Sequence, residues 1–212
     1  MRIATDAAVL VFAKAPLPGR AKTRLIPRLG ETGAARLQAR LTARALLTAR
    51  AAGCGAVELH GTPRARQGFF VFLENKFHVA LKGQAGRDLG ERMYNALARA
   101  LRRHRSAILI GTDCPALAPR DLRRAARLLR GGCDAVIAPA EDGGYALIGM
   151  RKVSAALFSG IAWGGPDVYA QTAKKLALAG YRWRALRTVW DLDRPADLDR
   201  LASLGLRGRR SS

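Results

Sequence analysis

Short apolar runs alternate along the chain with longer amphipathic segments rich in Ala, Leu and Arg. Continuous apolar runs of roughly four to eight residues, bounded by turn residues, are typical of strands buried on both faces of a parallel sheet. Ala7–Ala13 is such a run, because Asp6 precedes it and a Pro/Gly-rich stretch follows it. The same criterion predicts further strands at Ala56–His60, Ser106–Gly111, Asp134–Pro139 and Tyr145–Met150, and an edge strand at Tyr181–Val189.

The amphipathic segments between these runs predict helices with recognisable ends. Ala, Leu and Arg dominate from Glu31 to Ala52, and Gly53 supplies a C-terminal stop. Asp88 is a typical N-cap for a helix that runs to about His104. Further helices are predicted from Pro119 to a stop at Gly131-Gly132, over Pro166–Ala179 with Gly180 as its stop, and from about Pro195. Strands that alternate with helices of about ten or more residues indicate an α/β fold with a largely parallel sheet.

One aromatic segment lacks a clear period. Phe69–Leu73 (FFVFL) indicates a short strand or a core segment, and the preceding stretch Gly61–Gly68 indicates a polar loop. No internal repeat, linker or low-complexity stretch divides the sequence, so a single domain is predicted over residues 1–206. Residues 207–212 form a short basic tail that we expect to be loose.

Composition indicates a globular protein without naming its function. Hydrophobic residues make up 49% of the 212 positions, which excludes a disordered chain, a collagen-like repeat and a coiled coil. The longest apolar run is far short of the roughly 20 residues that cross a bilayer, and no signal-peptide pattern is present. We therefore expect a soluble, cytoplasmic protein. Cys54, Cys114 and Cys133 form no CxxC pair, so neither a disulfide framework nor a cysteine zinc site is indicated.

The net charge of +21, from 37 Lys+Arg against 16 Asp+Glu, raises the question of a nucleic-acid partner. Of the 37 cations 30 are Arg, a bias that a GC-rich genome can produce through its codons. Many arginines recur at helical spacing between Ala and Leu, which is typical of a solvated helix face. Aromatic residues make up only 6%, and no RNP-like or zinc-finger pattern is present, so no specific nucleic-acid binding is predicted. The charge would still attract polyphosphate ligands.

The segment after the first predicted strand is suited to binding anions. Within eleven residues it carries four cations, Lys14, Arg20, Lys22 and Arg24. Pro16 and Pro18 stiffen the turn, and Gly19 allows a ligand to approach the backbone closely. The cations could therefore hold phosphate oxygens by charge-assisted hydrogen bonds, or the segment could be only a solvated loop. It is not a Walker A loop, because GxxxxGK[ST] is absent.

In a parallel sheet, ligands bind beyond the carboxyl ends of the strands, so acids at strand ends are candidates for chemistry. Asp113 follows an apolar predicted strand and could bind a divalent ion that neutralises substrate phosphates, although a turn or N-cap role suits it equally well. Glu141 and Asp142 lie at the same predicted edge, in what could also be an ordinary Asp-Gly-Gly hairpin turn. Asp191 and Asp193 precede a Pro-initiated helix, where either could cap the helix and one could bind metal.

The order of these motifs resembles a known bacterial family. The DUF2064 group of nucleotide-diphospho-sugar transferase-like proteins, often labelled glycosyltransferases of arsenosugar biosynthesis, shares the order and spacing of FAKAPLPGRAKTRL, QAGRDLGERM, GTDCPAL, APAEDGGYALIG and WDLDRPADL. The resemblance spans Val9 to about Leu201. It implies a three-layer α/β/α, Rossmann-like GT-A fold with a mostly parallel mixed sheet. It also implies a more distant similarity to the molybdenum-cofactor and phospholactate guanylyltransferases.

The resemblance implies a role for each motif. The phosphates of a nucleotide would be bound by Lys14, Pro18, Gly19, Arg20, Lys22, Thr23 and Arg24. Mg²⁺ or Mn²⁺ would be bound by Asp113, with Asp191 or Asp193 as a second contact. The acceptor side of the cleft would be lined by Glu141, Asp142, Gly143, Gly144 and Tyr145, and further shaped by Gln84, Asp88, Arg92 and Trp163.

Three functions are compatible with these motifs. A glycosyltransferase would move a sugar from a nucleotide-diphospho-sugar to a small acceptor, with Glu141 or Asp142 as general base if the reaction inverts the anomeric centre. A nucleotidyltransferase of the guanylyltransferase kind would join an NTP to a phosphorylated small molecule and release pyrophosphate. A non-catalytic nucleotide-binding protein would use the same loop. Sugar transfer is the favoured alternative, and the expected partners are a nucleotide or nucleotide-sugar and a small acceptor.

Overall fold

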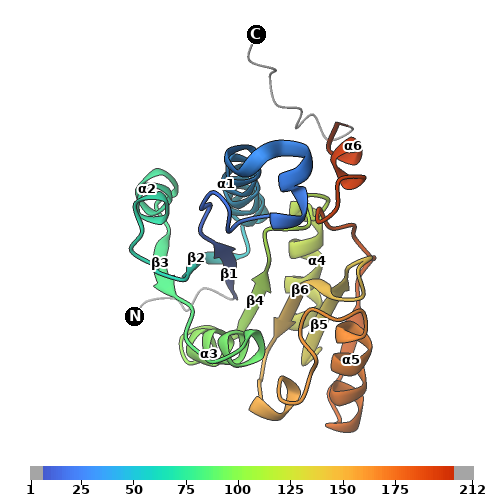
Figure 1. The fold of residues 1–212 in the computed structure, drawn as a ribbon. Coiled ribbons are helices and arrows are strands. Elements are labelled where there is room, and N and C mark those ends of the chain that lie inside the picture. The colour runs from blue at the N-terminus through green and yellow to red at the C-terminus, as the bar shows by residue number, and fades with distance from the viewer. Residues whose placement is uncertain (1–6, 203–212) are drawn as a thin grey trace.

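The computed structural model describes residues 7–202, and these residues form three layers around one seven-stranded sheet (Figure 1). The order of the strands across the sheet is β3-β2-β1-β4-β6-β5-β7. Along the chain the strands are β1 (Ala7–Lys14), β2 (Gly55–Thr62), β3 (Ala80–Gly83), β4 (Ser106–Ile110), β5 (Ala135–Pro139), β6 (Tyr145–Met150) and β7 (Trp183–Ala185). The tail predicted at 207–212 lies outside the described residues, and the domain boundary at 206 stays a prediction.

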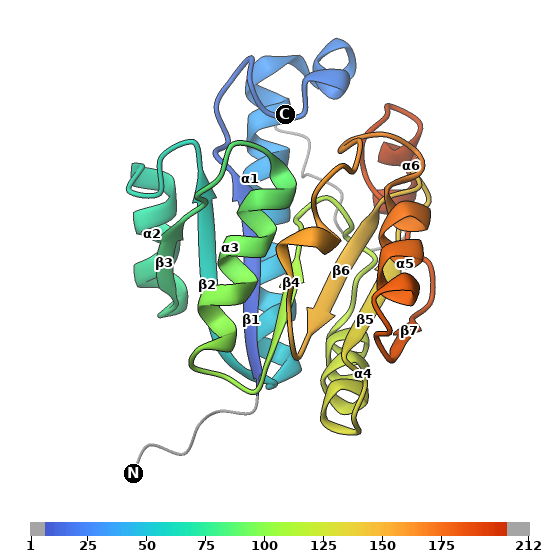
Figure 2. The ribbon, with the colours of Figure 1, turned by 90° about the horizontal axis from the view of Figure 1, so that it is seen from below.

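Strand β6 runs opposite to the other six strands of the sheet. β1 pairs in parallel with β2 and β4, β2 with β3, and β5 with β7, whereas β6 is antiparallel to both of its neighbours, β4 and β5. The predicted mostly parallel mixed sheet is therefore confirmed. The carboxyl ends of the six parallel strands and the start of β6 lie at one edge, which we call the carboxyl edge. The opposite edge is the amino edge. In Figure 2 the carboxyl edge is at the top.

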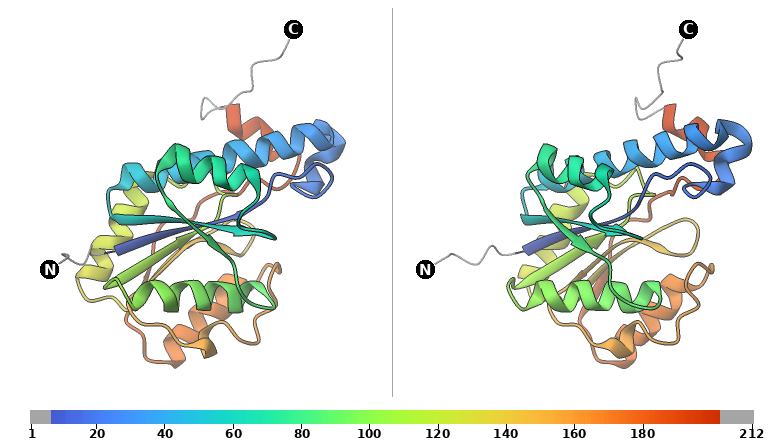
Figure 3. Two further views of the ribbon diagram at one scale, coloured as in Figure 1. Left: turned by 90° about the vertical axis from the view of Figure 1, so that its left-hand side faces the viewer. Right: turned by 60° about the vertical axis from the view of Figure 1, so that its left-hand side comes forward.

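Helices cover both faces of the sheet (Figure 3). One face packs against α1, α2 and α4, and the other against α3, α5 and the 3₁₀ helix η2. The helices are α1 (Ile26–Ala52), α2 (Gly68–Phe77), α3 (Leu89–Leu101), α4 (Pro119–Arg130), α5 (Val168–Leu178) and α6 (Asp197–Ala202), with the 3₁₀ helices η1 (Thr23–Leu25) and η2 (Ala155–Leu157). The five helices predicted from the sequence are thus confirmed, with shifts of a few residues at their ends.

Burial on both faces explains the continuous apolar run of β1. Val9 and Val11 pack into the core on the α1 side, while Ala8 and Leu10 pack into the core on the α3 side. All four side chains are fully buried. Because successive residues of a strand point to opposite faces, a strand that is covered on both sides has no position for a polar residue. β1 is therefore a rigid central support for the loop that follows it.

The aromatic segment Phe69–Leu73 lies in helix α2, so its prediction as a strand was wrong and its prediction as a core segment is confirmed. Phe70 and Leu73, three positions apart, are buried in the core, whereas Phe72 is 57% exposed. Such spacing belongs to a helix that lies across a sheet, and tertiary packing has overridden the strand preference of aromatic residues. The short strand β3, which follows α2, was not predicted.

Candidate functional site

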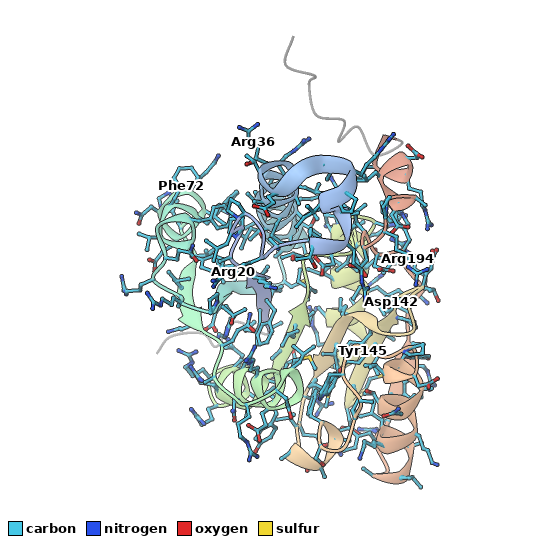
Figure 4. The ribbon with its side chains drawn as sticks, in the orientation of Figure 1. Arg20, Arg36, Phe72, Asp142, Tyr145 and Arg194 are labelled. Carbon is cyan, nitrogen blue, oxygen red and sulfur yellow. The ribbon has the colours of Figure 1, made fainter. Side chains whose placement is uncertain are left out.

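Loops from four parts of the chain meet at the carboxyl edge, which faces the viewer in Figures 1 and 4. We call them the basic loop (Lys14–Arg24), the β4 end (Gly111–Pro115), the β5–β6 turn (Ala140–Gly144) and the C-terminal segment (Val189–Asp193). Backbone hydrogen bonds join three of them: the Leu192 amide donates to the Asp113 carbonyl at 2.7 Å, and the Glu141 amide donates to the Val189 carbonyl at 3.0 Å. The sequence motifs predicted to form a site are therefore neighbours in space.

Lys22 ties three of these loops together. Its side chain is only 4% exposed, and its Nζ lies 2.7 Å from Asp113 Oδ1. The same ammonium donates a hydrogen bond of 2.5 Å to the carbonyl oxygen of Leu192. A buried ammonium is stable only with such partners, because removing a charge from water is costly. Lys22 therefore holds the basic loop against the β4 end and the C-terminal segment, and its predicted contact with a phosphate stays a prediction.

Arg24 makes a second connection between the basic loop and the C-terminal segment. Its guanidinium pairs with the carboxylate of Asp193. Nearby, a small apolar cluster of Leu25, Leu41, Leu192 and Leu201 packs the same segments together. Asp193 and Arg194 donate their backbone N–H groups to the Asp197 carboxylate at 3.0 and 2.7 Å. Two of the four predicted phosphate-binding cations thus contact two of the three predicted metal ligands.

The other two cations of the basic loop, Lys14 and Arg20, are exposed (Arg20 is labelled in Figure 4). Within residues 7–202 neither side chain has a hydrogen bond or ion pair to a protein group. The turn that presents Arg20 is well defined, because the Arg20 and Ala21 amides both donate to the Leu17 carbonyl, at 3.0 and 3.1 Å. Lys14 and Arg20 are therefore the cations best placed to receive an anionic ligand.

Three carboxylates concentrate negative charge opposite the basic loop. Burial raises the pKa of the Cys114 thiol, and the charges of Asp113, Asp191 and Asp142 raise it further. Burial also raises the pKa of Asp191, with the charge of Asp142 as the next cause. Asp113 itself is 58% exposed. An excess of negative charge around a half-buried carboxylate is the environment that a bound cation would relieve.

The same carboxylates decide how well a divalent ion fits. Among residues 7–202, no three His, Cys, Asp or Glu side chains are close enough together to hold a metal ion alone. Mg²⁺ is commonly bound by one or two carboxylates and completes its shell with phosphate oxygens and water. Asp113 and Asp191 could form such a partial ligand set, although Asp113 is paired with Lys22 just as Asp193 is paired with Arg24. The metal assignment stays a prediction.

Asparagine at position 191 is expected to stabilise the fold at neutral pH. Because the folded-state pKa of Asp191 is raised, the folded protein binds this proton more tightly than the unfolded chain, and the carboxylate destabilises the fold as pH rises above its ordinary pKa of 3.8. Asp191→Asn should raise Tm by roughly 1–3 °C at pH 7. The gain should vanish near pH 3, and a gain that persisted there would contradict this electrostatic origin. Thermal unfolding followed by circular dichroism at several pH values measures it.

The two predicted general bases, Glu141 and Asp142, are adjacent in the β5–β6 turn but have different surroundings. Glu141 is bound by both Nη atoms of Arg200 at 2.7 and 3.0 Å, and this guanidinium also lies 4.7 Å above the Trp190 ring. The arginine holds the pKa of Glu141 below its usual range. Asp142 is exposed, and one of its oxygens accepts the Gly144 amide at 2.8 Å. Asp142 therefore has the freer carboxylate, and the assignment of a base stays a prediction.

Gly143 is required by the geometry of the same turn. Its φ is +87°, and a Cβ added there would lie 1.7 Å from the Pro166 carbonyl oxygen. The Gly143 carbonyl accepts the Tyr169 amide at 2.8 Å. The turn is therefore packed closely against the start of α5. A residue with a side chain cannot occupy position 143 unless the turn or the Pro166 carbonyl moves.

Tyr145 and Trp163 form an aromatic wall beside the turn. Their rings meet edge to face with centroids 6.5 Å apart, and Trp163 also stacks on Phe158 at 6.4 Å. The Tyr145 hydroxyl is 3.9 Å from the Met93 sulfur, and burial raises the pKa of this tyrosine. Met93 ends the QAGRDLGERM motif, but neither Met93 nor Phe158 was given a role from the sequence, because an apolar side chain carries no local sign of a site.

The predicted cleft residues Gln84, Asp88 and Arg92 make local structural contacts. Gln84 Nε2 donates to the His60 carbonyl at 2.8 Å and so joins the loop after β3 to β2. Asp88 accepts the Glu91 amide at 2.8 Å, which confirms the predicted N-cap of α3. Arg92 Nε donates to the Gly86 carbonyl at 3.1 Å. These residues shape the loop between β3 and α3, and their contact with a ligand stays a prediction.

Two further observations bear on the class of protein. No helix within residues 7–202 is long and apolar enough to cross a membrane. The model of the family DUF2064, described as an uncharacterized protein conserved in bacteria, matches residues 44–165. The basic loop lies outside this matched range.

Solved structures show the same fold over nearly the whole chain. A protein from Desulfovibrio desulfuricans, provisionally assigned as a nucleotide-diphospho-sugar transferase, is 31% identical over 98% of this chain and 92% of its own, with a TM-score of 0.85. The 4-diphosphocytidyl-2C-methyl-D-erythritol synthase of Anaerococcus prevotii is 8% identical over 96% and 100%, with a TM-score of 0.65. A Mycobacterium tuberculosis protein in complex with manganese is 22% identical over 94% and 99%, with a TM-score of 0.53. A search of curated proteins found no match.

Proposed function

The chain belongs to the DUF2064 family, and from that premise we propose that it is a transferase that moves a glycosyl group from a nucleotide-diphospho-sugar to a small acceptor. One observation carries the proposal. Two solvent-facing cations, Lys14 and Arg20, share the carboxyl edge with the exposed carboxylates of Asp113 and Asp142. Such an edge can bind a diphosphate and an acceptor side by side. The likeness to the Desulfovibrio desulfuricans protein supports a sugar nucleotide as donor.

The basic loop would bind the donor diphosphate. Lys14 and Arg20 would donate charge-assisted hydrogen bonds to its oxygens, which are stronger than neutral ones. As the sugar–oxygen bond breaks, charge grows on the leaving nucleoside diphosphate, and cations fixed in advance stabilise that charge most. Lys22 keeps the basic loop in position, because its contacts with Asp113 and Leu192 fix the loop.

A divalent ion, Mg²⁺ or Mn²⁺, would be held by Asp113 and Asp191, and when bound it would supply neutralisation of the diphosphate charge. The fold neighbour from Mycobacterium tuberculosis that binds manganese supports the choice of ion. On the acceptor side, Asp142 would accept a proton from the acceptor hydroxyl. Glu141 would instead fix the turn through its two hydrogen bonds to Arg200.

Nucleotidyl transfer is the second candidate function. The fold neighbours include enzymes of cytidylyl transfer, such as the Anaerococcus prevotii protein, which match this chain over nearly its full length but at low identity. The same cations would then bind an NTP, and pyrophosphate would leave when an acceptor phosphate attacks the α-phosphorus. The two functions differ in the nucleotide that the carboxyl edge prefers, and a ligand panel separates them.

The test is a thermal-shift panel of nucleoside triphosphates and sugar nucleotides, each with and without Mn²⁺. A ligand at about 100 times its Kd adds about 2.7 kcal/mol of stability, which is roughly 5–10 °C in Tm for a chain of this size. Metal-dependent stabilisation by one sugar nucleotide is the expected result. Stabilisation by NTPs alone would replace the proposal with nucleotidyl transfer, and no shift with any nucleotide would overturn both.

Alanine at position 20 is expected to weaken binding of the active nucleotide by roughly 10- to 150-fold, because an arginine that donates to phosphate is commonly worth about 1.5–3 kcal/mol. Arg124→Ala on the exposed face of α4 removes the same charge far from the carboxyl edge and should change Kd less than about twofold. Isothermal titration calorimetry at one salt concentration measures both variants. Equal losses would show that net charge, and not the basic loop, holds the ligand.

A further inference from the structure

A pocket of about 320 Å³ opens at the amino edge of the sheet. Figure 2 shows this edge of the sheet at its lower end. This volume lies within the range of about 300–1,000 Å³ that is usual for small-molecule sites. Its floor is formed where the first residues of β1 and β4, Ala7 and Ser106, pair with each other. The other lining residues are Arg105, Ala126, Leu129, Arg130 and Arg151.

Three guanidinium groups from three separate elements converge on this pocket. Arg105 precedes β4, Arg130 ends α4, and Arg151 follows β6. Among residues 7–202 the lining contains no carboxylate. A fourth arginine, Arg182, stands close by, since its Nη1 and that of Arg151 lie 3.8 and 4.0 Å from the point that a Cβ on Gly132 would occupy; Arg182 is itself paired with Asp134 at 3.9 Å. Cations gathered this way repel one another, and an anion among them removes that repulsion.

The neighbouring acid at this edge is already engaged. Asp134 accepts the Arg182 amide at 3.0 Å and pairs with Lys152 at 3.3 Å, and these contacts hold its pKa below the usual range. Within residues 7–202 the side chains of Arg105 and Arg151 form no ion pair with an acid. Arg130 lies in the last turn of α4, where a cation is favoured by the helix dipole, so it alone would not indicate a ligand.

Composition bias does not account for this arrangement. The arginines that follow the helical spacing of the sequence lie on exposed helix faces, as Arg124 does. Arg105 and Arg151 instead lie in the connections at the ends of β4 and β6, and they meet only because β6 runs antiparallel beside β4. The arrangement of the strands therefore creates this pocket. The guanidinium groups of Arg105 and Arg151, which form no ion pair within residues 7–202, are suited to bidentate contact with phosphate oxygens.

We propose that this pocket binds a small anion carrying two or more phosphate groups. β1 has eight residues, so the pocket lies roughly 25 Å from the basic loop along the strand direction. A ligand here would not occupy the donor site, and the two sites can be filled together. The proposal does not depend on which reaction the carboxyl edge catalyses.

The test uses inorganic diphosphate as the probe and the full chain in calorimetric titrations. To leave the amino-edge pocket as the remaining site, the titrations start from Lys14→Ala/Arg20→Ala, which removes the exposed cations of the basic loop. In that background, Arg105→Gln/Arg151→Gln should raise Kd for diphosphate at least tenfold. The charge-matched control Arg124→Gln/Lys174→Gln, on exposed faces of α4 and α5, should change it less than about twofold.

Two results would overturn the proposal. Equal weakening in the variant and its control would mean that diphosphate follows net charge alone, and no change in the Arg105→Gln/Arg151→Gln variant would mean that the pocket takes no phosphate. Arg105→Lys/Arg151→Lys keeps the charge and removes the forked donors, so an intermediate Kd is expected. Thermal unfolding of every variant is measured in parallel, so that a loss of binding can be distinguished from a loss of folding.

Discussion

Alanine at position 143 is expected to cost about 2–5 kcal/mol of folding stability and to abolish transfer activity. Two costs add: a non-glycine residue at φ +87° is strained by about 1–2 kcal/mol, and an added Cβ would overlap the Pro166 carbonyl oxygen, which must then move. The β5–β6 turn would shift away from α5, and Asp142 and Glu141 would move with it. Chemical denaturation gives the stability, and a coupled assay for released nucleotide gives the activity.

Gly164 provides a matched control for this prediction. It also has a φ of +87°, but a Cβ built there meets nothing within 4 Å. Gly164→Ala should therefore cost only the backbone strain, about 1–2 kcal/mol. If the two variants lose the same stability, the close contact between the turn and Pro166 does not constrain the site, and the steric argument fails.

Asparagine at position 113 is expected to damage both stability and metal-dependent nucleotide binding. The change leaves the Lys22 ammonium buried with the Leu192 carbonyl but without its carboxylate. Breaking a fully buried pair costs about 3–5 kcal/mol, and exposure of Asp113 reduces this to about 1–3 kcal/mol, or roughly 3–10 °C in Tm. Affinity for the nucleotide should lose its dependence on Mn²⁺, which titrations with and without the ion measure.

The double variant Asp113→Asn/Lys22→Met separates the two effects. Removing the ammonium together with its partner leaves no buried charge, so this variant should be more stable than Asp113→Asn alone, with a coupling energy of about 1 kcal/mol or more. It should not recover Mn²⁺-dependent binding, because the carboxylate is still missing. A double variant as unstable as the sum of its single changes would show that Lys22 and Asp113 do not stabilise each other.

Local patterns were enough to predict most of the fold. The run Ala7–Ala13 is buried on both faces, Gly53 does adopt a left-handed conformation after α1, and Asp88 does cap α3. Each of these depends on neighbours within a few residues, which a sequence displays directly. The antiparallel β6 follows from the same kind of argument, since the five residues Ala140–Gly144 are too few for a parallel crossover.

The roles of the charged residues could not be read from local sequence. Lys14, Arg20, Lys22 and Arg24 look equivalent in the sequence, yet Lys14 and Arg20 have no ion pair within residues 7–202 and the other two are paired with acids far along the chain. Glu141 and Asp142 are adjacent, and only the position of Arg200 distinguishes them. The helical state of Phe69–Leu73 was missed for a similar reason, because the sheet beneath α2 selects it. Partners separated by many residues decide these outcomes.

The contact between Lys22 and Leu192 joins positions 170 residues apart. During synthesis a ribosome adds roughly 5–20 residues per second, so the basic loop is made well before its support at Val189–Asp193 emerges. Until then the Lys22 ammonium has no Leu192 carbonyl to bind, and the loop lacks the anchor that fixes it. The basic loop and β1 are therefore made long before the segment that anchors the loop, whereas strand β7 (Trp183–Ala185) emerges only just ahead of that segment. The carboxyl edge can be completed only after Val189–Asp193 has emerged and the Leu192 carbonyl has reached Lys22.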